Sequence, residues 1–159
     1  MDKAKDSVFQ QAIVDSLTAS TWLEGKSEHY DRELSLYPDD LLAYIHETQP
    51  EAVTKLTKFY HDKTDQQILK RAASEMDKHG SLHVLRHGFK DHGAKFRLCQ
   101  FKPDHGLNPE TLTRYEANHL RVVQEASYSP HAREGYNPRL DLVLFVNGIP
   151  VATLELKSE

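Results

Sequence analysis

Cysteine, tryptophan and long apolar runs are scarce in this sequence of 159 residues. The single cysteine, Cys99, excludes an intramolecular disulfide and a cysteine-rich zinc site. No apolar run reaches the roughly 18 residues that a membrane-spanning helix needs, and the charged N-terminus leads into no apolar signal segment. We therefore expect a protein of the reducing cytoplasm with no membrane partner.

The composition is that of one soluble domain with a real core, since hydrophobic residues make up 38% and charged residues 28%. The net charge of -4 is unevenly distributed. Residues 1–77 carry nine Lys and Arg against fifteen Asp and Glu, whereas residues 78–159 carry eleven against nine. Within 78–102 a single acid, Asp91, accompanies six basic residues. Such a segment is either a phosphate-contacting face or a solvated surface stretch.

The first part of the chain, 1–80, is predicted to be helical. Apolar residues recur at three- and four-residue spacing over 8–17 and 65–78, and Gly80 marks an end. Pro38 and Pro50 each suit the first turn of a further helix.

The second part predicts a short helix near 108–118 and strands at 94–101, 120–126, 140–146 and 151–156. Asn147-Gly148 between the last two is a hairpin signal. Cys99 falls in the first of these strands and is expected to be buried and inert. We predict an α/β fold, α+β-like, with a mixed sheet flanked by helices and a sheet-bearing core at about 94–159.

Three charged residues stand in the otherwise apolar last two strands: Asp141, Glu155 and Lys157. Charges in such strands are costly unless paired or bound to metal. Two carboxylates suit Mg²⁺, and a lysine two residues after one of them shares its face and can stabilise charge on a phosphate. The set therefore favours metal-assisted hydrolysis of a phosphodiester. The alternative is a plain hairpin with exposed charges at its ends.

The hairpin geometry tests this interpretation. A regular two-residue loop at Asn147-Gly148 pairs Asp141 with Leu154, which puts Glu155 on the other face and prevents a shared metal site. A three-residue connection or one β-bulge brings the carboxylates together. We therefore predict a bulge or a three-residue turn, with Gly148 at positive φ.

Longer stretches resemble a known family, the N-terminal nuclease domain of type I restriction enzyme R subunits. The segments that carry the resemblance are RLDLVLFVNGIPVATLELK at 139–157, YDRE at 30–33, PDDL at 38–41, LHVLRHGFK at 82–90 and FRLCQFKP at 96–103. The resemblance spans nearly the whole chain, which we take as one N-terminal endonuclease domain, 1–159.

The resemblance implies a restriction-endonuclease-like fold and a Mg²⁺-dependent, type I site-specific deoxyribonuclease of the bacterial cytoplasm. It implies that Asp141 and Glu155 bind Mg²⁺ with the backbone carbonyl of Leu156, and that Lys157 is the catalytic lysine. The implied partners are duplex DNA and the methyltransferase and specificity subunits of a restriction complex.

The sequence departs from the family pattern at three places. Leu140 replaces the usual proline before the aspartate, and the first helix offers Gln10 and Gln11 where many relatives have a glutamate that binds metal. The chain also stops two residues after Lys157, where the family continues with the rest of the core and two ATP-binding motor domains. We therefore expect a fragment without an ATP site, and we do not extend the predicted cleavage activity to this chain alone.

Other patterns are weaker. Residues 20–27 differ from a phosphate-binding loop by one substitution, but no strand precedes them. His79, His83 and His87 are spaced for one helix face, but Gly80 interrupts them and no cysteine completes a zinc set.

DNA contact is the rival role for the basic segment. We assign it to the cations that interleave with Phe89 and Phe96, namely Arg86, Lys90, Lys95 and Arg97. Two other functions stay open for the whole chain: a stand-alone repair or junction nuclease of the same fold, and a non-catalytic DNA-binding or assembly module.

Overall fold

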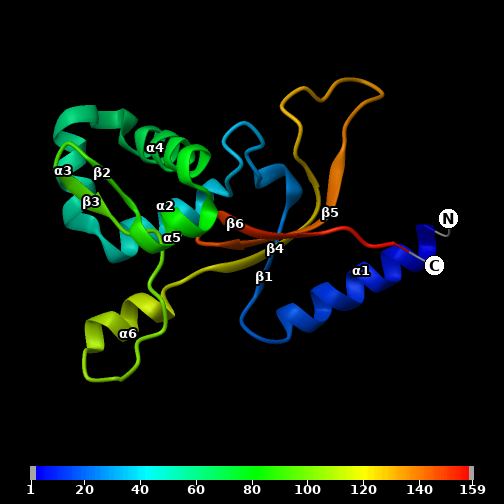
Figure 1. The fold of residues 1–159 in the computed structure, drawn as a ribbon, viewed down its shortest axis with the longest axis horizontal. Helices are drawn as coiled ribbons and strands as arrows, with labels where there is room; N and C mark the ends of the chain where they lie inside the picture. Colours follow the sequence, from blue (N-terminus) through cyan, green and yellow to red (C-terminus); the bar gives the residue numbers. More distant parts are fainter. Residues whose placement is uncertain (1–2, 158–159) are drawn as a thin grey trace.

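The computed structural model describes residues 3–157 and consists of a mixed four-stranded sheet with helices on its faces and at one end (Figure 1). The sheet order is β1-β4-β5-β6, with β1 (Leu23–Gly25) parallel to β4 (Leu120–Ser127). β5 (Arg139–Val146) is antiparallel to both β4 and β6 (Ile149–Leu154). The predicted fold class, α/β with a mixed sheet, is confirmed.

The helices begin and end where the sequence signals lie. α2 (Pro38–Thr48) and α3 (Pro50–Tyr60) each start at a proline, which has no N–H to leave unsatisfied in the first turn. α4 (Thr64–His79) ends at Gly80, whose φ of 86° few other residues adopt. In α6 (Pro109–Glu116) the Asn108 side chain accepts hydrogen bonds from the first-turn N–H groups.

Three elements differ from the sequence prediction. The strand expected at 94–101 is shorter, because β3 (Ala94–Phe96) pairs only with β2 (Phe89–Asp91) and the chain then leaves the small sheet. α5 (Ser81–His87) was not predicted, although it packs Val84 and Leu85 into the core. β1 lies within 1–80, so the part predicted to be helical also contributes a strand to the sheet.

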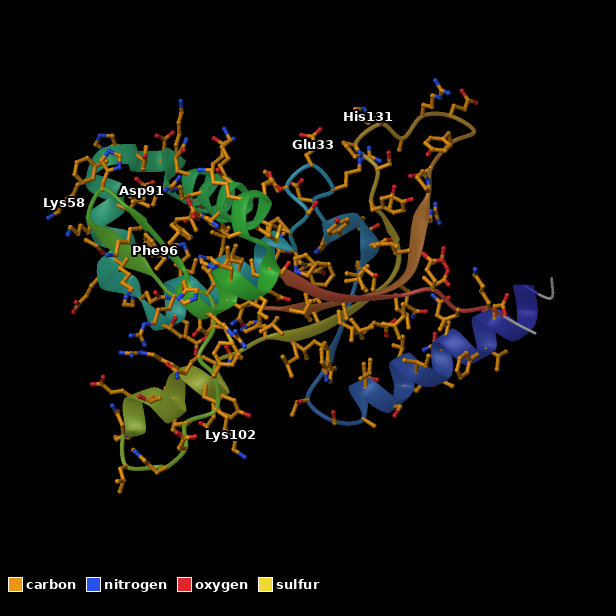
Figure 2. All side chains as sticks on the ribbon, in the orientation of Figure 1. Glu33, Lys58, Asp91, Phe96, Lys102 and His131 are labelled. Atoms are coloured by element: carbon orange, nitrogen blue, oxygen red, sulfur yellow. The ribbon has the colours of Figure 1, made fainter. Side chains whose placement is uncertain are left out.

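The sheet is covered differently on its two faces. α1 (Lys3–Thr18) packs Val14 against Val122 and Leu142 on one face. On the other face Tyr37 packs against Val143 and Phe145, with the two rings 5.8 Å apart. A larger cluster holds α2 to α5 and the β2–β3 hairpin together around Tyr44, Leu56, Ile68 and Phe96, and Ile149 of β6 joins it. Figure 2 shows Phe96 within this helical body.

No helix in the described part of the chain is both long and apolar enough to cross a membrane.

Candidate functional site

The turn between β5 and β6 combines a two-residue loop with a bulge. Asn147 and Gly148 have φ values of 48° and 76°, as a type I′ turn requires, and Val146 pairs with Ile149. The register then shifts by one residue between Leu144 and Phe145. The bulge and the positive φ of Gly148 that the sequence predicts are thus confirmed.

The shift changes which residues face each other further along the hairpin. After it Leu144 pairs with Ala152 and Leu142 with Leu154, so the next position places Asp141 opposite Glu155. Directly opposite residues of antiparallel strands have neighbouring side chains. Continued past the last paired residues, Leu142 and Leu154, this register puts Asp141 and Glu155 on the same face at the far end of the hairpin, which the regular register would have prevented.

The turn itself is fixed by buried polar contacts. The fully buried Asn147 side chain accepts a hydrogen bond from the His119 N–H at 2.6 Å and donates to the Leu98 carbonyl at 2.9 Å and to Asn118 Oδ1 at 2.7 Å. A Cβ on Gly148 would lie 2.3 Å from the Tyr37 carbonyl oxygen, so only glycine fits there. These contacts hold the register on which the carboxylate pair depends.

One oxygen of the Asp141 carboxylate accepts a backbone hydrogen bond. Its Oδ2 accepts a hydrogen bond of 2.6 Å from the Leu156 N–H, and the residue is half-buried. The Asp141 carbonyl accepts a hydrogen bond from Gln10 Nε2 at 3.1 Å. Among the side chains that the structure describes, those of residues 6–157, none forms an ion pair with this carboxylate. Its remaining lone pairs are therefore available to a ligand.

Glu155 and Lys157 lie beyond the last residue of β6 and are exposed, while Leu156 between them is half-buried. If the Glu155 carboxylate and the Leu156 carbonyl joined Asp141 around an ion, the donor set would be all oxygen, which is what Mg²⁺ prefers. The described residues contain no group of three or more His, Cys, Asp or Glu side chains arranged for a metal. A bound ion would therefore need water or phosphate oxygens to complete its shell.

Two further residues lie near Asp141: Gln10, which the sequence placed where relatives carry a metal-binding glutamate, and Glu125, which the sequence prediction missed. Gln10 of α1, 8% exposed, donates hydrogen bonds to Gln124 Oε1 and to the Asp141 carbonyl, and so ties the first helix to the site strand. Glu125 of β4 falls between Gln124 and Ala126, the partners of Leu142 and Leu140; it has a φ of 53° and pairs with Arg139 at 4.0 Å. An acid in a half-exposed strand carries no sequence signal for such a position.

The comparison with protein families gives a match to the model described as the type I restriction enzyme R protein N terminus (HSDR_N), over residues 33–159. The chain belongs to this family. The match includes β4, β5, β6 and the three charged residues of the candidate site. Neither the search of curated proteins nor the search of solved structures found a match.

The predicted DNA-contact residues of this R-protein N terminus do not all lie together. Lys90 of β2 pairs directly with Lys95 of β3, and Arg97 follows two residues later. Arg86 instead lies exposed on α5. The β2–β3 hairpin lies toward one end of the longest axis of the molecule and the end of β6 toward the other (Figure 1).

The three histidines do align although Gly80 separates α4 from α5. The rings of His79 and His83 are 4.5 Å apart, as are those of His83 and His87. Partial desolvation, followed by the two flanking imidazoles, lowers the pKa of His83. Ring–ring packing accounts for this arrangement, and among the described residues no metal-binding group includes these histidines.

Proposed function

We propose that this chain is the Mg²⁺-dependent endonuclease domain of a type I restriction enzyme R subunit, which hydrolyses phosphodiester bonds of duplex DNA within a restriction-modification complex. The observation that carries the proposal is the bulge in the β5–β6 hairpin, which sets Asp141 opposite Glu155. Membership of the R-protein N-terminal family supports the same function.

In the proposed mechanism Asp141 and Glu155 would hold the cation together with the Leu156 carbonyl. The ion would supply Lewis-acid polarisation of the scissile phosphate and activation of water. The Leu156 N–H fixes the orientation of the Asp141 carboxylate through its hydrogen bond to Oδ2. Lys157, exposed beside Glu155, stabilises negative charge that develops on the phosphate oxygens.

The role of Gln10 in this proposal is to position and not to bind the ion. Its Nε2 donates to Gln124 Oε1 and to the Asp141 carbonyl, so these two partners orient the side chain. The neutral amide thus aligns the site strand on α1 and leaves Asp141 and Glu155 as the charged ligands of the proposed metal shell.

A metal titration tests the first step. We expect Mn²⁺ to bind the chain and to raise its unfolding temperature, as any ligand of the folded state does. Asp141→Asn should abolish both effects because it removes a charged ligand. Asp104→Asn, an exposed acid in the loop before α6, is the matched control and should retain them.

The second test uses the complete restriction complex. Asp141→Asn and Lys157→Ala should each abolish DNA cleavage while leaving assembly with the methyltransferase and specificity subunits intact. If both variants restrict DNA normally, the catalytic assignment is wrong. Metal binding without any cleavage by the assembled complex would instead favour the non-catalytic DNA-binding or assembly module.

A further inference from the structure

A second charged site lies in the helical body, away from the Asp141 carboxylate. A surface pocket of about 240 Å³ is lined by three cations and three neutral polar side chains, namely Lys95, Arg97, Arg114, Tyr44, Thr48 and Gln49. No acidic residue is among its lining residues. Another polar pocket is lined by Arg32 and Arg139 but also by Glu28 and Glu125, so its positive and negative charges cancel.

The backbone that carries the cations is held rigidly. The Gln49 side chain accepts a hydrogen bond from the Arg97 N–H at 2.6 Å and donates to the Arg97 carbonyl at 2.8 Å. This two-point contact fixes the position of Arg97 at the mouth of the pocket. A rigid polar frame lowers the entropic cost of binding a ligand.

The cations of the pocket are poorly neutralised. In the described part of the chain neither Lys95 nor Arg97 forms an ion pair, and Arg114 has only an exposed partner, Glu110, at 3.5 Å. Lys90 stands directly opposite Lys95 and adds positive charge. Like charges this close repel one another, so an anion is the ligand that would relieve the arrangement.

Tyr44 adds a hydrogen-bond donor to the pocket. Its ring is 1% exposed and belongs to the main core cluster, while the residue also lines the pocket. Burial raises the pKa of Tyr44 to about 12, and the nearby charges of Arg114 and Arg97 offset part of that rise. The hydroxyl therefore stays protonated at neutral pH.

We propose that the pocket formed by Lys95, Arg97 and Arg114 binds a phosphate of the DNA backbone, at a point remote from the β5–β6 carboxylates. Guanidinium groups match the geometry of phosphate oxygens, and phosphate contacts position DNA without reading its sequence. The choice of DNA as the source of the phosphate rests on the proposed nuclease function. Arg114 and Tyr44 thereby join the contact surface, and Arg86 lies outside it.

The test measures binding of a short labelled DNA duplex to the full chain over a range of salt concentrations, without divalent metal. Arg97→Gln/Arg114→Gln should weaken binding about tenfold or more for unrelated sequences alike, and should reduce the slope of log K against log salt by about 1. Lys63→Gln/Lys70→Gln removes the same charge from exposed positions beside and on α4 and should change affinity less than about twofold. If the two double variants lose the same duplex affinity, the pocket is not a DNA-phosphate site.

Further measurements distinguish free phosphate from DNA as the ligand, and distinguish this pocket from the proposed carboxylate site. Inorganic phosphate should compete with the duplex and should perturb the amide signals of Arg97 and Gln49. Phosphate binding with unchanged duplex affinity in Arg97→Gln/Arg114→Gln overturns DNA as the source. Tyr44→Phe, which keeps the buried ring, should give a smaller loss of duplex affinity in the same direction. Duplex binding is measured without metal and metal binding is measured without DNA, so a failure of the pocket can be told apart from a failure of the carboxylate site.

Discussion

Asp40 and Asp141 are aspartates at opposite ends of the same sheet, and they differ in how completely their oxygens are satisfied. Asp40, 2% exposed, accepts hydrogen bonds from Arg121 Nε at 2.5 Å and Nη2 at 2.7 Å, and His119 Nδ1 lies 3.3 Å away. Asp141 is half-buried and accepts one backbone hydrogen bond, from Leu156. The first carboxylate is closed by its partners, whereas the second keeps oxygen lone pairs for a ligand.

We call the end of the sheet beside Asp40 and Arg121 the closed end, and the end with Asp141 the open end. The closed end contains the Asn147-Gly148 turn and the hydrogen bonds that hold the register of the hairpin. Arg121 also donates to the Glu24 carbonyl at 3.1 Å and lies over the Tyr37 ring at 5.0 Å, so one side chain joins β4, β1 and the start of α2. The hydrogen bonds to Asp40 raise the pKa of Arg121 further above its ordinary value. The open end carries Asp141, Glu155 and Lys157, whose alignment depends on this closed end. Stability and chemistry are thus divided between the two ends.

We expect the largest change in the free energy of unfolding at Asp40. Asp40→Ala leaves the Arg121 charge in a largely buried place without its partner and should lower the free energy of unfolding by about 3–5 kcal/mol. The neighbouring Asp39→Ala is the control, because Asp39 is 70% exposed and pairs only with the exposed His29. Its effect should stay below about 1 kcal/mol. Urea denaturation of both variants measures the difference, and equal losses would contradict the comparison.

The next effect is expected at the turn. Asn147→Gly keeps a residue that tolerates positive φ but removes three hydrogen bonds from fully buried surroundings. We expect the free energy of unfolding to fall by about 2–3 kcal/mol, since the former partners of the Asn147 side chain stay buried without a hydrogen bond. Asn108→Gly at the start of α6, an exposed cap, should cost only a few tenths of a kcal/mol. If both changes lower the free energy of unfolding equally, the buried contacts of Asn147 do not hold the register of the hairpin.

The sequence was informative where local patterns decide structure. Asn147-Gly148 predicted the turn, and the odd or even separation of Asp141 and Glu155 predicted the bulge, because strand side chains alternate. The pairing of Asp40 with Arg121 joins residues 81 positions apart and has no local signature. The same holds for Arg114 in the cationic pocket, which comes from a different element than Lys95 and Arg97.

Short elements account for most of the remaining differences. β1 has three residues and is a strand because it pairs with β4, nearly a hundred positions away in sequence. α5 has seven residues, too few for a clear helical period, and it is stabilised by core packing of Val84 and Leu85. The predicted strand beyond Phe96 failed because no partner strand reaches that segment.

At the open end we expect a small effect on stability. Asp141→Asn removes a charge opposite Glu155 and keeps an oxygen that can accept the Leu156 N–H. Without metal, the free energy of unfolding should change by less than about 1 kcal/mol. With Mn²⁺ at about a hundred times its dissociation constant, the native chain alone should gain about 2.7 kcal/mol. A large loss for Asp141→Asn in metal-free buffer would place this carboxylate with Asp40 as a structural group.

The smallest effect concerns Cys99, which follows the Leu98 carbonyl that Asn147 binds and thus belongs to the closed end. Burial raises the pKa of the Cys99 thiol from 9.0 to about 11. Because the thiolate is the reactive form, the folded protein should react with a disulfide reagent much more slowly at pH 8 than the chain unfolded in urea. The raised pKa favours folding of the protonated form, so stability should be constant below pH 9 and should fall as the pH rises toward 11. Rates measured in absorbance before and after addition of urea test this, and equal rates would mean that the closed end opens readily to solvent.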